Sequence, residues 1–314
     1  MNPFRNRDVI DITDFSRDNL EWLFMITDYI LEQRRPLHDA LRGKILAYAF
    51  FEPSTRTRLS FESAMKRLGG DTIGFARTME TSVRKGEKFV DTLRMLDMYS
   101  DVIVVRHPLE GAAKLAAEIC KHPVINGGDG RFQHPTQTML DLYTIYREFG
   151  EIDGLTIGIL GDLRFARTIN SLLMGLCLFN PKKIFLISPE ILKPREMIIE
   201  YLKKHNMRFE ILGDVNDAIG ELDVLYVVRI QKERFPDPAE YERIKGSYRI
   251  TLEILKNARD TLKIMHPLPK IDELDPEIDN TKYALYFKQA SYGLYVRMAL
   301  LLSILIDDPL GILE

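Results

Sequence analysis

The sequence contains little cysteine, little excess charge and no long apolar run. Only two of its 314 residues, Cys120 and Cys177, are cysteines, too few for a disulfide framework. Its 43 basic and 46 acidic residues leave a net charge of −3, which argues against a nucleic-acid or membrane-surface protein. The first residues lack the apolar core of a signal peptide, and the apolar stretch Met298–Ile306 is too short to span a bilayer. We therefore expect a cytoplasmic protein without a nucleic-acid or membrane partner.

Apolar residues are plentiful, and their pattern predicts the fold class. They make up 46% of the chain, which is enough to bury a core and excludes long disorder. Short apolar runs alternate with helical patterns, which favours an α/β fold of mostly parallel sheets flanked by helices. The predicted strands are Ile45–Phe51, Val102–Val105, Val124–Ile125, Thr156–Leu160, Ile184–Ile187, Phe209–Leu212 and Val224–Val228.

The length and the turn signals predict two domains. At about 150 residues per domain, the chain is long enough for two. The boundary signal is Gly150–Gly154, directly after a helical pattern that begins at His134-Pro135. We expect a first domain over 1–133, an interdomain helix over 134–150, a second domain over 151–288 and a terminal helix over 289–314.

The first candidate site follows the first predicted strand. Ligands of parallel sheets bind at the carboxyl ends of the strands. There, Ser54, Thr55, Arg56, Thr57 and Arg58 open a predicted helix. Helix N-termini bind anions through free N–H groups and the helix dipole, so we predict a phosphate site, with Arg56 or Arg58 supplying the charge. The alternative is an ordinary capped helix with surface arginines.

Two further segments of the first half end at the same predicted edge. Arg106 follows the second strand and would be a second anion-binding group. His134 lies at a helix entrance, where the helix dipole favours a neutral imidazole that can donate to a carbonyl oxygen. Gln137 lies one turn further on. Alone, Arg106 could be a surface residue and His134 a helix cap.

The second half offers two arginines and a proline-rich loop. Arg167 and Arg229 each follow a strand and suit a ligand with two carboxylates, although each could be a surface arginine. The glycines lack the G-x-G-x-x-G spacing of dinucleotide sites, which argues against a nicotinamide dehydrogenase. The loop His266–Pro269 can present backbone carbonyls to an amide N–H, or is a plain turn. No HExxH, CxxC or activated nucleophile is present, so we expect positioning chemistry without metal or cofactor.

Five segments together resemble the carbamoyltransferase family, and within it the aspartate enzymes. The resemblance covers nearly the whole chain, in order. It rests on FFEPSTRTRLSFE, VVRHPLEGAA, GDGRFQHPTQTMLDLYTI, VVRIQKERF and MHPLPKIDEL.

The resemblance implies a role for each matching residue. The phosphate of carbamoyl phosphate would be held by Ser54, Thr55, Arg56 and Thr57. Its carbonyl oxygen would contact Thr57, Arg106 and His134, and its amide end would contact Gln137 and the carbonyls of Pro267 and Leu268. The carboxylates of L-aspartate would be held by Arg167, Arg229 and Gln231.

The family's assembly is also implied by the resemblance. The terminal helix would return to the first domain, and three chains would form a homotrimer with shared active sites. Lys85 matches a family residue that reaches into a neighbouring subunit's site, and the paired serine aligns with either Thr81 or Ser82. Many relatives also bind regulatory chains. We further expect the charged stretch Gln231–Lys245 to be a mobile loop.

The implied reaction transfers the carbamoyl group from carbamoyl phosphate to the α-amino group of L-aspartate. One alternative is a carbamoyltransferase with another acceptor, such as ornithine, although two arginines disfavour a cationic acceptor. Another is a catalytically silent assembly subunit that only binds carbamoyl phosphate.

Overall fold

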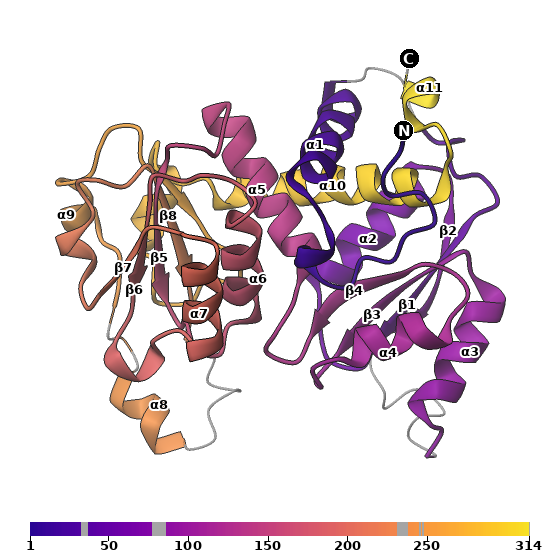
Figure 1. Cartoon of the computed structure of the whole chain (residues 1–314), viewed down its shortest axis with the longest axis horizontal. Coiled ribbons are helices and arrows are strands. Elements are labelled where there is room, and N and C mark those ends of the chain that lie inside the picture. The colour runs from indigo at the N-terminus through magenta and orange to yellow at the C-terminus, as the bar shows by residue number, and fades with distance from the viewer. Residues whose placement is uncertain (33–36, 77–85, 231–237, 245, 247, 314) are drawn as a thin grey trace. The chain divides into compact units, whose positions relative to one another are not determined.

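Two compact units make up the chain, and each contains one parallel sheet covered by helices (Figure 1). One unit comprises Met1–Tyr143 and Tyr292–Glu314, and the other comprises Thr144–Ser291. This computed structural model describes residues 1–32, 37–76, 86–230, 238–244, 246 and 248–313. The architecture confirms the predicted fold class, including the return of the terminal helix to the first unit. Thr81, Ser82, Lys85 and Gln231 lie outside the described residues.

The first unit is built on a four-stranded sheet with the order β2-β1-β3-β4. Its apolar strands are paired in parallel, and Phe50 of β1 lies opposite Arg106 of β3. Leu93 of α3 and Ala116 of α4 pack into one apolar cluster on this sheet. The elements are α1 (Arg17–Glu32), β1 (Ile45–Phe50), α2 (Arg56–Arg67), β2 (Asp71–Phe75), α3 (Phe89–Tyr99), β3 (Val102–His107), α4 (Ala112–Ile119), β4 (Val124–Asp129), the first part of α5 (Pro135–Phe149), the later part of α10 (Tyr286–Leu305) and α11 (Pro309–Leu313).

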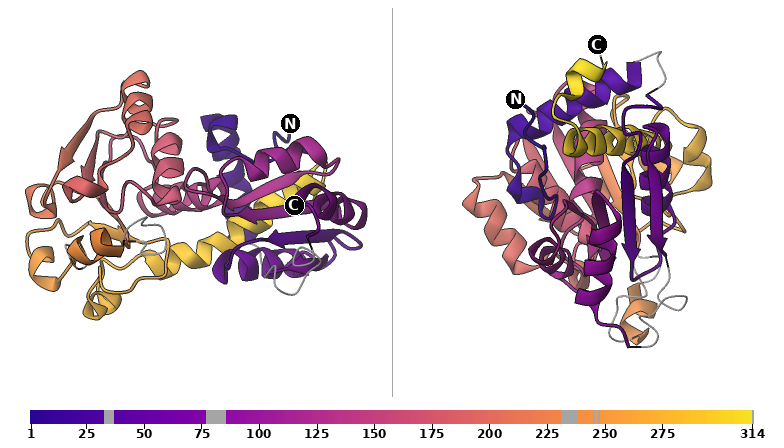
Figure 2. Two further views of the ribbon diagram at one scale, coloured as in Figure 1. Left: turned by 90° about the horizontal axis from the view of Figure 1, so that it is seen from below. Right: turned by 90° about the vertical axis from the view of Figure 1, so that its right-hand side faces the viewer.

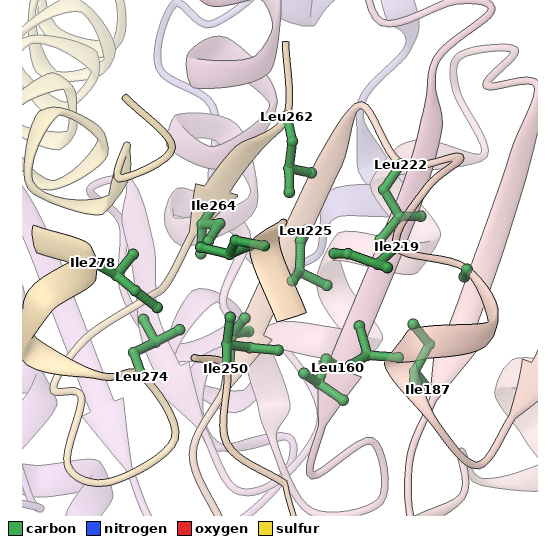
Figure 3. Packing of buried hydrophobic residues seen from close by; sticks show 14 of the residues in the cluster. Leu160, Ile187, Ile219, Leu222, Leu225, Ile250, Leu262, Ile264, Leu274 and Ile278 are labelled. Atoms are coloured by element: carbon green, nitrogen blue, oxygen red, sulfur yellow. The ribbon is translucent and has the colours of Figure 1, made fainter. Parts of the chain in front are cut away.

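The second unit is built on a five-stranded parallel sheet with the order β7-β6-β5-β8-β9. Three of these strands, β5, β8 and β9, contribute Leu160, Leu225 and Ile264 to one buried cluster (Figure 3). The elements are β5 (Thr156–Gly161), α6 (Arg167–Leu176), β6 (Lys183–Ile187), α7 (Glu196–Lys204), β7 (Phe209–Leu212), β8 (Val224–Val228), α8 (Pro238–Ile244), α9 (Leu252–Leu255) and β9 (Lys263–Met265).

Two helices run across the boundaries of the units. The boundary between Tyr143 and Thr144 lies within α5, and the boundary between Ser291 and Tyr292 lies within α10. Each is one uninterrupted helix, as Figure 2 shows for α10. No described helix combines the length and apolarity needed to cross a membrane.

The structure adds elements that the sequence patterns did not predict. β2 and α3 are two of them. β2 is an edge strand with no buried residue, and only two residues of α3 are buried, so neither leaves a clear apolar pattern. The stretch predicted as a mobile loop contains a helix, α8, over its described residues 238–244. The mobility of Gln231–Lys245 stays a prediction, because residues 231–237 and 245 lie outside the described residues.

Candidate active site

The strand order of the first unit creates a binding edge between β1 and β3. The chain proceeds from β1 outward to β2, then returns to place β3 on the other side of β1. Ligands of open α/β sheets bind outside the carboxyl ends of the strands at such a reversal. Ser54–Thr57 follow β1, and Arg106 is the last residue but one of the neighbouring β3, so both predicted groups lie at this reversal.

The start of α2 has the properties of an anion site. Thr55 precedes the helix but makes no side-chain cap hydrogen bond, and the first turn contains no acidic residue. Thr57 is buried and Arg56 is exposed. Arg58 forms an ion pair with Glu62, with an Nη1–Oε2 distance of 2.8 Å. Arg56 is the first residue of α2, at the end of the helix that favours anions, so it is a candidate for contact with a bound anion.

Arg106 is held by a carboxylate that the sequence analysis overlooked. Its Nε lies 2.9 Å from Glu52 Oε1, and its Nη1 donates to the carbonyl of Gly127 at 3.0 Å. Both side chains of the ion pair are largely buried. These contacts hold the guanidinium, and a bound anion would compete with Glu52 for it. Glu52 lies two residues after β1, the strand that pairs with β3, but an ion pair between residues so far apart in the chain leaves no periodic signal in the sequence.

A buried hydrogen-bond network shapes the loop before α5. Asn126 Nδ2 donates to Asp129 Oδ1 at 3.0 Å, and Asp129 Oδ2 accepts from the N–H of Gly111 at 2.9 Å. At Gly130, φ is 47°, and a Cβ would lie 2.6 Å from the backbone nitrogen of Glu110. The loop held by this network ends at His134, which is only 4% exposed and directly precedes α5.

Gln137 lies in the first turns of α5 and contacts a second overlooked carboxylate. Its Nε2 donates to Asp141 Oδ1 at 2.9 Å. Gln137 is partly exposed, whereas Asp141 is fully buried. The two residues are four positions apart, so they face the same side of the helix. That spacing was readable in the sequence.

The second unit has its own reversal of strand order, between β5 and β8. The chain proceeds from β5 to β6 and β7, then places β8 and β9 on the other side. Arg167 begins α6 after β5 and is 4% exposed, whereas Arg229 follows β8 and is partly exposed. The structure therefore brings the two predicted arginines to the carboxyl ends of adjacent strands. Two guanidinium groups there can bind two carboxylates.

The loop after β9 is held by a buried histidine. His266 Nδ1 accepts from the backbone N–H of Leu268 at 2.8 Å, and Nε2 lies 2.7 Å from Glu273 Oε1. Because Nδ1 is an acceptor, the neutral ring carries its proton on Nε2 and donates it to Glu273. Leu268 has a φ of 54°, which is strained for leucine. The buried contacts of His266 thus fix the loop that carries the carbonyls of Pro267 and Leu268.

Burial and charge set the protonation states of this pair. Burial lowers the pKa of His266, and the positive charge of Arg229 acts in the same direction, while Glu273 opposes both. Burial also disfavours the charge on Glu273, but hydrogen bonds from His266 and from backbone N–H groups bring its pKa below the usual value. At neutral pH the pair is a neutral imidazole beside a carboxylate.

The described part of the chain contains no cluster of residues that could bind a metal ion. Within those residues, no three histidine, cysteine, aspartate or glutamate side chains gather closely enough to hold a metal ion. The polar groups predicted to contact ligands at the two sheet edges are instead mainly arginines, hydroxyls, one histidine, one amide and backbone groups. Such groups bind anions and polarise carbonyls.

Family models match both units. Residues 7–147 match the carbamoyl-phosphate binding domain of aspartate/ornithine carbamoyltransferases, and residues 153–304 match their aspartate/ornithine binding domain. The chain belongs to the aspartate/ornithine carbamoyltransferase family. The β1–β3 edge therefore lies in the carbamoyl-phosphate region of the family, and the β5–β8 edge in its amino-acid region.

Individual relatives narrow the resemblance to the aspartate branch. The chain is 61% identical over 302 residues to the aspartate carbamoyltransferase catalytic subunit of Pyrobaculum arsenaticum, covering 96% of this chain and 99% of the relative. The corresponding subunit of Thermococcus kodakarensis is 55% identical over 300 residues, covering 95% and 96%.

Solved structures show the same fold. The aspartate transcarbamoylase of Trypanosoma cruzi, in complex with carbamoyl phosphate and aspartate, has a TM-score of 0.92 and 35% identity, covering 97% of this chain and 98% of that one. The catalytic subunit of the M. jannaschii enzyme has a TM-score of 0.86 and 49% identity, covering 94% and 97%.

Proposed function

We propose that this chain transfers the carbamoyl group of carbamoyl phosphate to the α-amino group of L-aspartate, giving N-carbamoyl-L-aspartate and phosphate. The observation that carries the proposal is the placement of anion-binding groups at both strand reversals. Ser54–Thr57 and Arg106 lie at one, and Arg167 and Arg229 lie at the other. The similarity to aspartate carbamoyltransferases supports the choice of acceptor.

In this proposal, the first unit binds carbamoyl phosphate. The N-terminus of α2, with Ser54, Thr55 and Arg56, holds the phosphate. Thr57, Arg106 and His134 donate to the carbonyl oxygen. Gln137 contacts the amide end, together with the carbonyls of Pro267 and Leu268 from the second unit's loop. For Arg106 to take this role, the ligand must share it with Glu52 or displace Glu52.

The second unit binds the acceptor. Arg167 and Arg229, joined by Gln231, hold the two carboxylates of aspartate, and Lys85 adds a further positive charge. Ornithine has one carboxylate and a cationic side chain, so the second guanidinium would repel it. Aspartate is therefore the acceptor that the charges favour.

The chemical step uses these groups to stabilise charge. The uncharged α-amino nitrogen of aspartate attacks the carbonyl carbon, and negative charge develops on the carbonyl oxygen. Donors from Thr57, Arg106 and His134 stabilise that oxygen. The bond between the carbonyl carbon and the bridging phosphate oxygen then breaks, and a phosphate oxygen accepts the proton from the amine.

The assembly and the setting are part of the proposal. We expect a homotrimer in which Lys85 of one chain serves the site of its neighbour, with regulatory chains as further partners. The relatives are catalytic subunits, which supports an assembly. We place the reaction in the cytoplasm, because Cys120 and Cys177 are both free thiols.

A carbamoylation assay on the purified chain tests the function. The protein receives carbamoyl phosphate with either aspartate or ornithine, and each ureido product is quantified. We expect turnover with aspartate only. Turnover with ornithine would contradict the assignment of the two arginines, and no turnover in a protein that binds carbamoyl phosphate would indicate a silent subunit.

A further inference from the structure

One turn after Gln137, helix α5 contains a buried carboxylate, Asp141, that forms a hydrogen bond with Gln137. Asp141 is 0% exposed, and it accepts a hydrogen bond from Gln137 Nε2 at 2.9 Å. Gln137 itself is partly exposed, so it can contact a ligand on one side and Asp141 on the other. None of the roles assigned above involves Asp141.

The hydrogen bond to Asp141 determines which end of the Gln137 amide faces outward. The carboxyl oxygen Oδ1 of Asp141 accepts from Gln137 Nε2, so the NH₂ group of the amide faces Asp141. The carbonyl oxygen Oε1 of Gln137 then points away from Asp141. An amide oxygen in that position accepts a hydrogen bond from an NH₂ group but gains nothing from a methyl group.

The terminal helix supplies a buried cation whose charge interacts with Asp141. Arg297 of α10 is 4% exposed, donates from Nη1 to the carbonyl of Gly293 at 3.1 Å, and lies 5.1 Å from the ring centre of Phe61 in α2. Burial lowers the pKa of Arg297 to about 10, which leaves it charged at neutral pH, and its charge interacts favourably with Asp141. A buried carboxylate is tolerated when a buried cation accompanies it.

We propose that Asp141, supported by Arg297, is a positioning residue that orients the Gln137 amide and so selects a carbamoyl group over acyl groups that lack an N–H donor. The inference rests on the proposed function, in which Gln137 contacts the amide end of carbamoyl phosphate. It also gives a reason for the return of α10 to the first unit: this helix carries the cation that Asp141 needs.

The test compares two ligands that differ only at the selected group. Acetyl phosphate has the phosphate and carbonyl of carbamoyl phosphate, but a methyl group in place of NH₂. Dissociation constants for both are measured by calorimetry without aspartate, on the wild-type protein and on Asp141→Leu, Asp141→Asn and Gln137→Met. Turnover with aspartate is measured separately, so failure of the proposed function is distinguished from failure of this inference.

We expect Asp141→Leu to lose about tenfold in affinity for carbamoyl phosphate, because one hydrogen bond loses its alignment. Its affinity for acetyl phosphate should be unchanged. Gln137→Met should show the same loss of selectivity, and the Asp141→Leu/Gln137→Met double variant should lose no more than either single variant. Asp141→Asn keeps one acceptor oxygen and should retain most of the selectivity.

A matched control and a fallback variant keep the test decisive. Asp28 of α1 accepts from Tyr143 of α5 at 2.7 Å without contacting Gln137, so Asp28→Leu should leave the selectivity unchanged. If Asp141→Leu fails to fold, the Asp141→Leu/Arg297→Met variant removes both buried charges together. Unchanged selectivity in folded Asp141→Leu or Asp141→Leu/Arg297→Met, or an equal loss of both affinities in these variants, would overturn the inference.

Discussion

His134 is the residue on which the proposed stabilisation of the carbonyl oxygen depends most. Its side chain is buried at the entrance of α5, where the helix dipole favours a neutral ring that can donate a hydrogen bond. We expect His134→Ala to lower kcat by about 10²–10³-fold, because one preorganised donor is lost in the transition state. Affinity for carbamoyl phosphate should change much less. An unchanged kcat in steady-state kinetics would remove His134 from this role.

The hydrogen bond by which His266 holds the loop after β9 depends on pH. The pKa of His266 is lowered in the folded protein, so its contribution to stability is present above about pH 6.5, the unfolded value, and is lost as the pH falls through the folded value. Protonation of Nδ1 would remove the acceptor for the Leu268 N–H. Glu273, whose pKa is also lowered, acts with the same sign, and Arg229 and Lys270 are the other charges that act on the ring.

Two substitutions separate the functions of the two ring nitrogens. His266→Asn keeps an acceptor near Nδ1, and His266→Gln keeps a donor near Nε2. We expect the asparagine variant to retain more affinity for carbamoyl phosphate. We also expect its free energy of unfolding to fall less steeply than that of the wild type as the pH drops from 7 to 5, because asparagine does not titrate. Parallel pH profiles in urea unfolding would contradict this.

At the scale of secondary structure, strand β8 positions Arg229 at the carboxyl edge of its sheet. The stability of this strand depends on its buried side chains. Leu225 is fully buried in the cluster of the second unit (Figure 3). Leu225→Ala should lower the free energy of unfolding by about 2–5 kcal/mol, through lost apolar contact and a residual cavity. Leu252→Ala on α9, where the side chain is 38% exposed, is the control and should change it by less than about 0.5 kcal/mol. Similar effects in urea unfolding would contradict the assigned core.

The same scale shows what sequence patterns can predict. Runs such as Val224–Val228 are buried on both sides and were predicted as strands, because continuous apolar runs are typical of parallel sheets. β2, which has no buried residue, was missed. The positions of Ser54–Thr57, Arg106 and Arg229 at strand ends agree with the structure, whereas their binding roles stay predictions. Glu52 was not identified as a partner of Arg106, because a long-range ion pair leaves no periodic signal. The link from Gln137 to Asp141 was readable at a spacing of four.

At the scale of the whole molecule, each active site of the proposed trimer is built from residues of two neighbouring chains. If Lys85 serves the neighbouring chain, Lys85→Ala and His134→Ala homotrimers should each have little activity. Mixing the two after partial dissociation should restore activity, because some sites in hybrid trimers combine a native Lys85 with a native His134. Absence of restoration, with hybrid formation verified by native mass spectrometry, would contradict a shared site.

The division of the two substrates between the two units can be tested by one paired measurement. Carbamoyl phosphate affinity by calorimetry and KM for aspartate are measured for Arg106→Ala and Arg229→Ala. We expect Arg229→Ala to raise the KM for aspartate by about 30-fold or more, with carbamoyl phosphate binding nearly unchanged, since each arginine contacts one substrate. Arg106→Ala should instead lose carbamoyl phosphate binding. If Arg229→Ala weakened both substrates equally, the assignment of one substrate to each unit would be wrong.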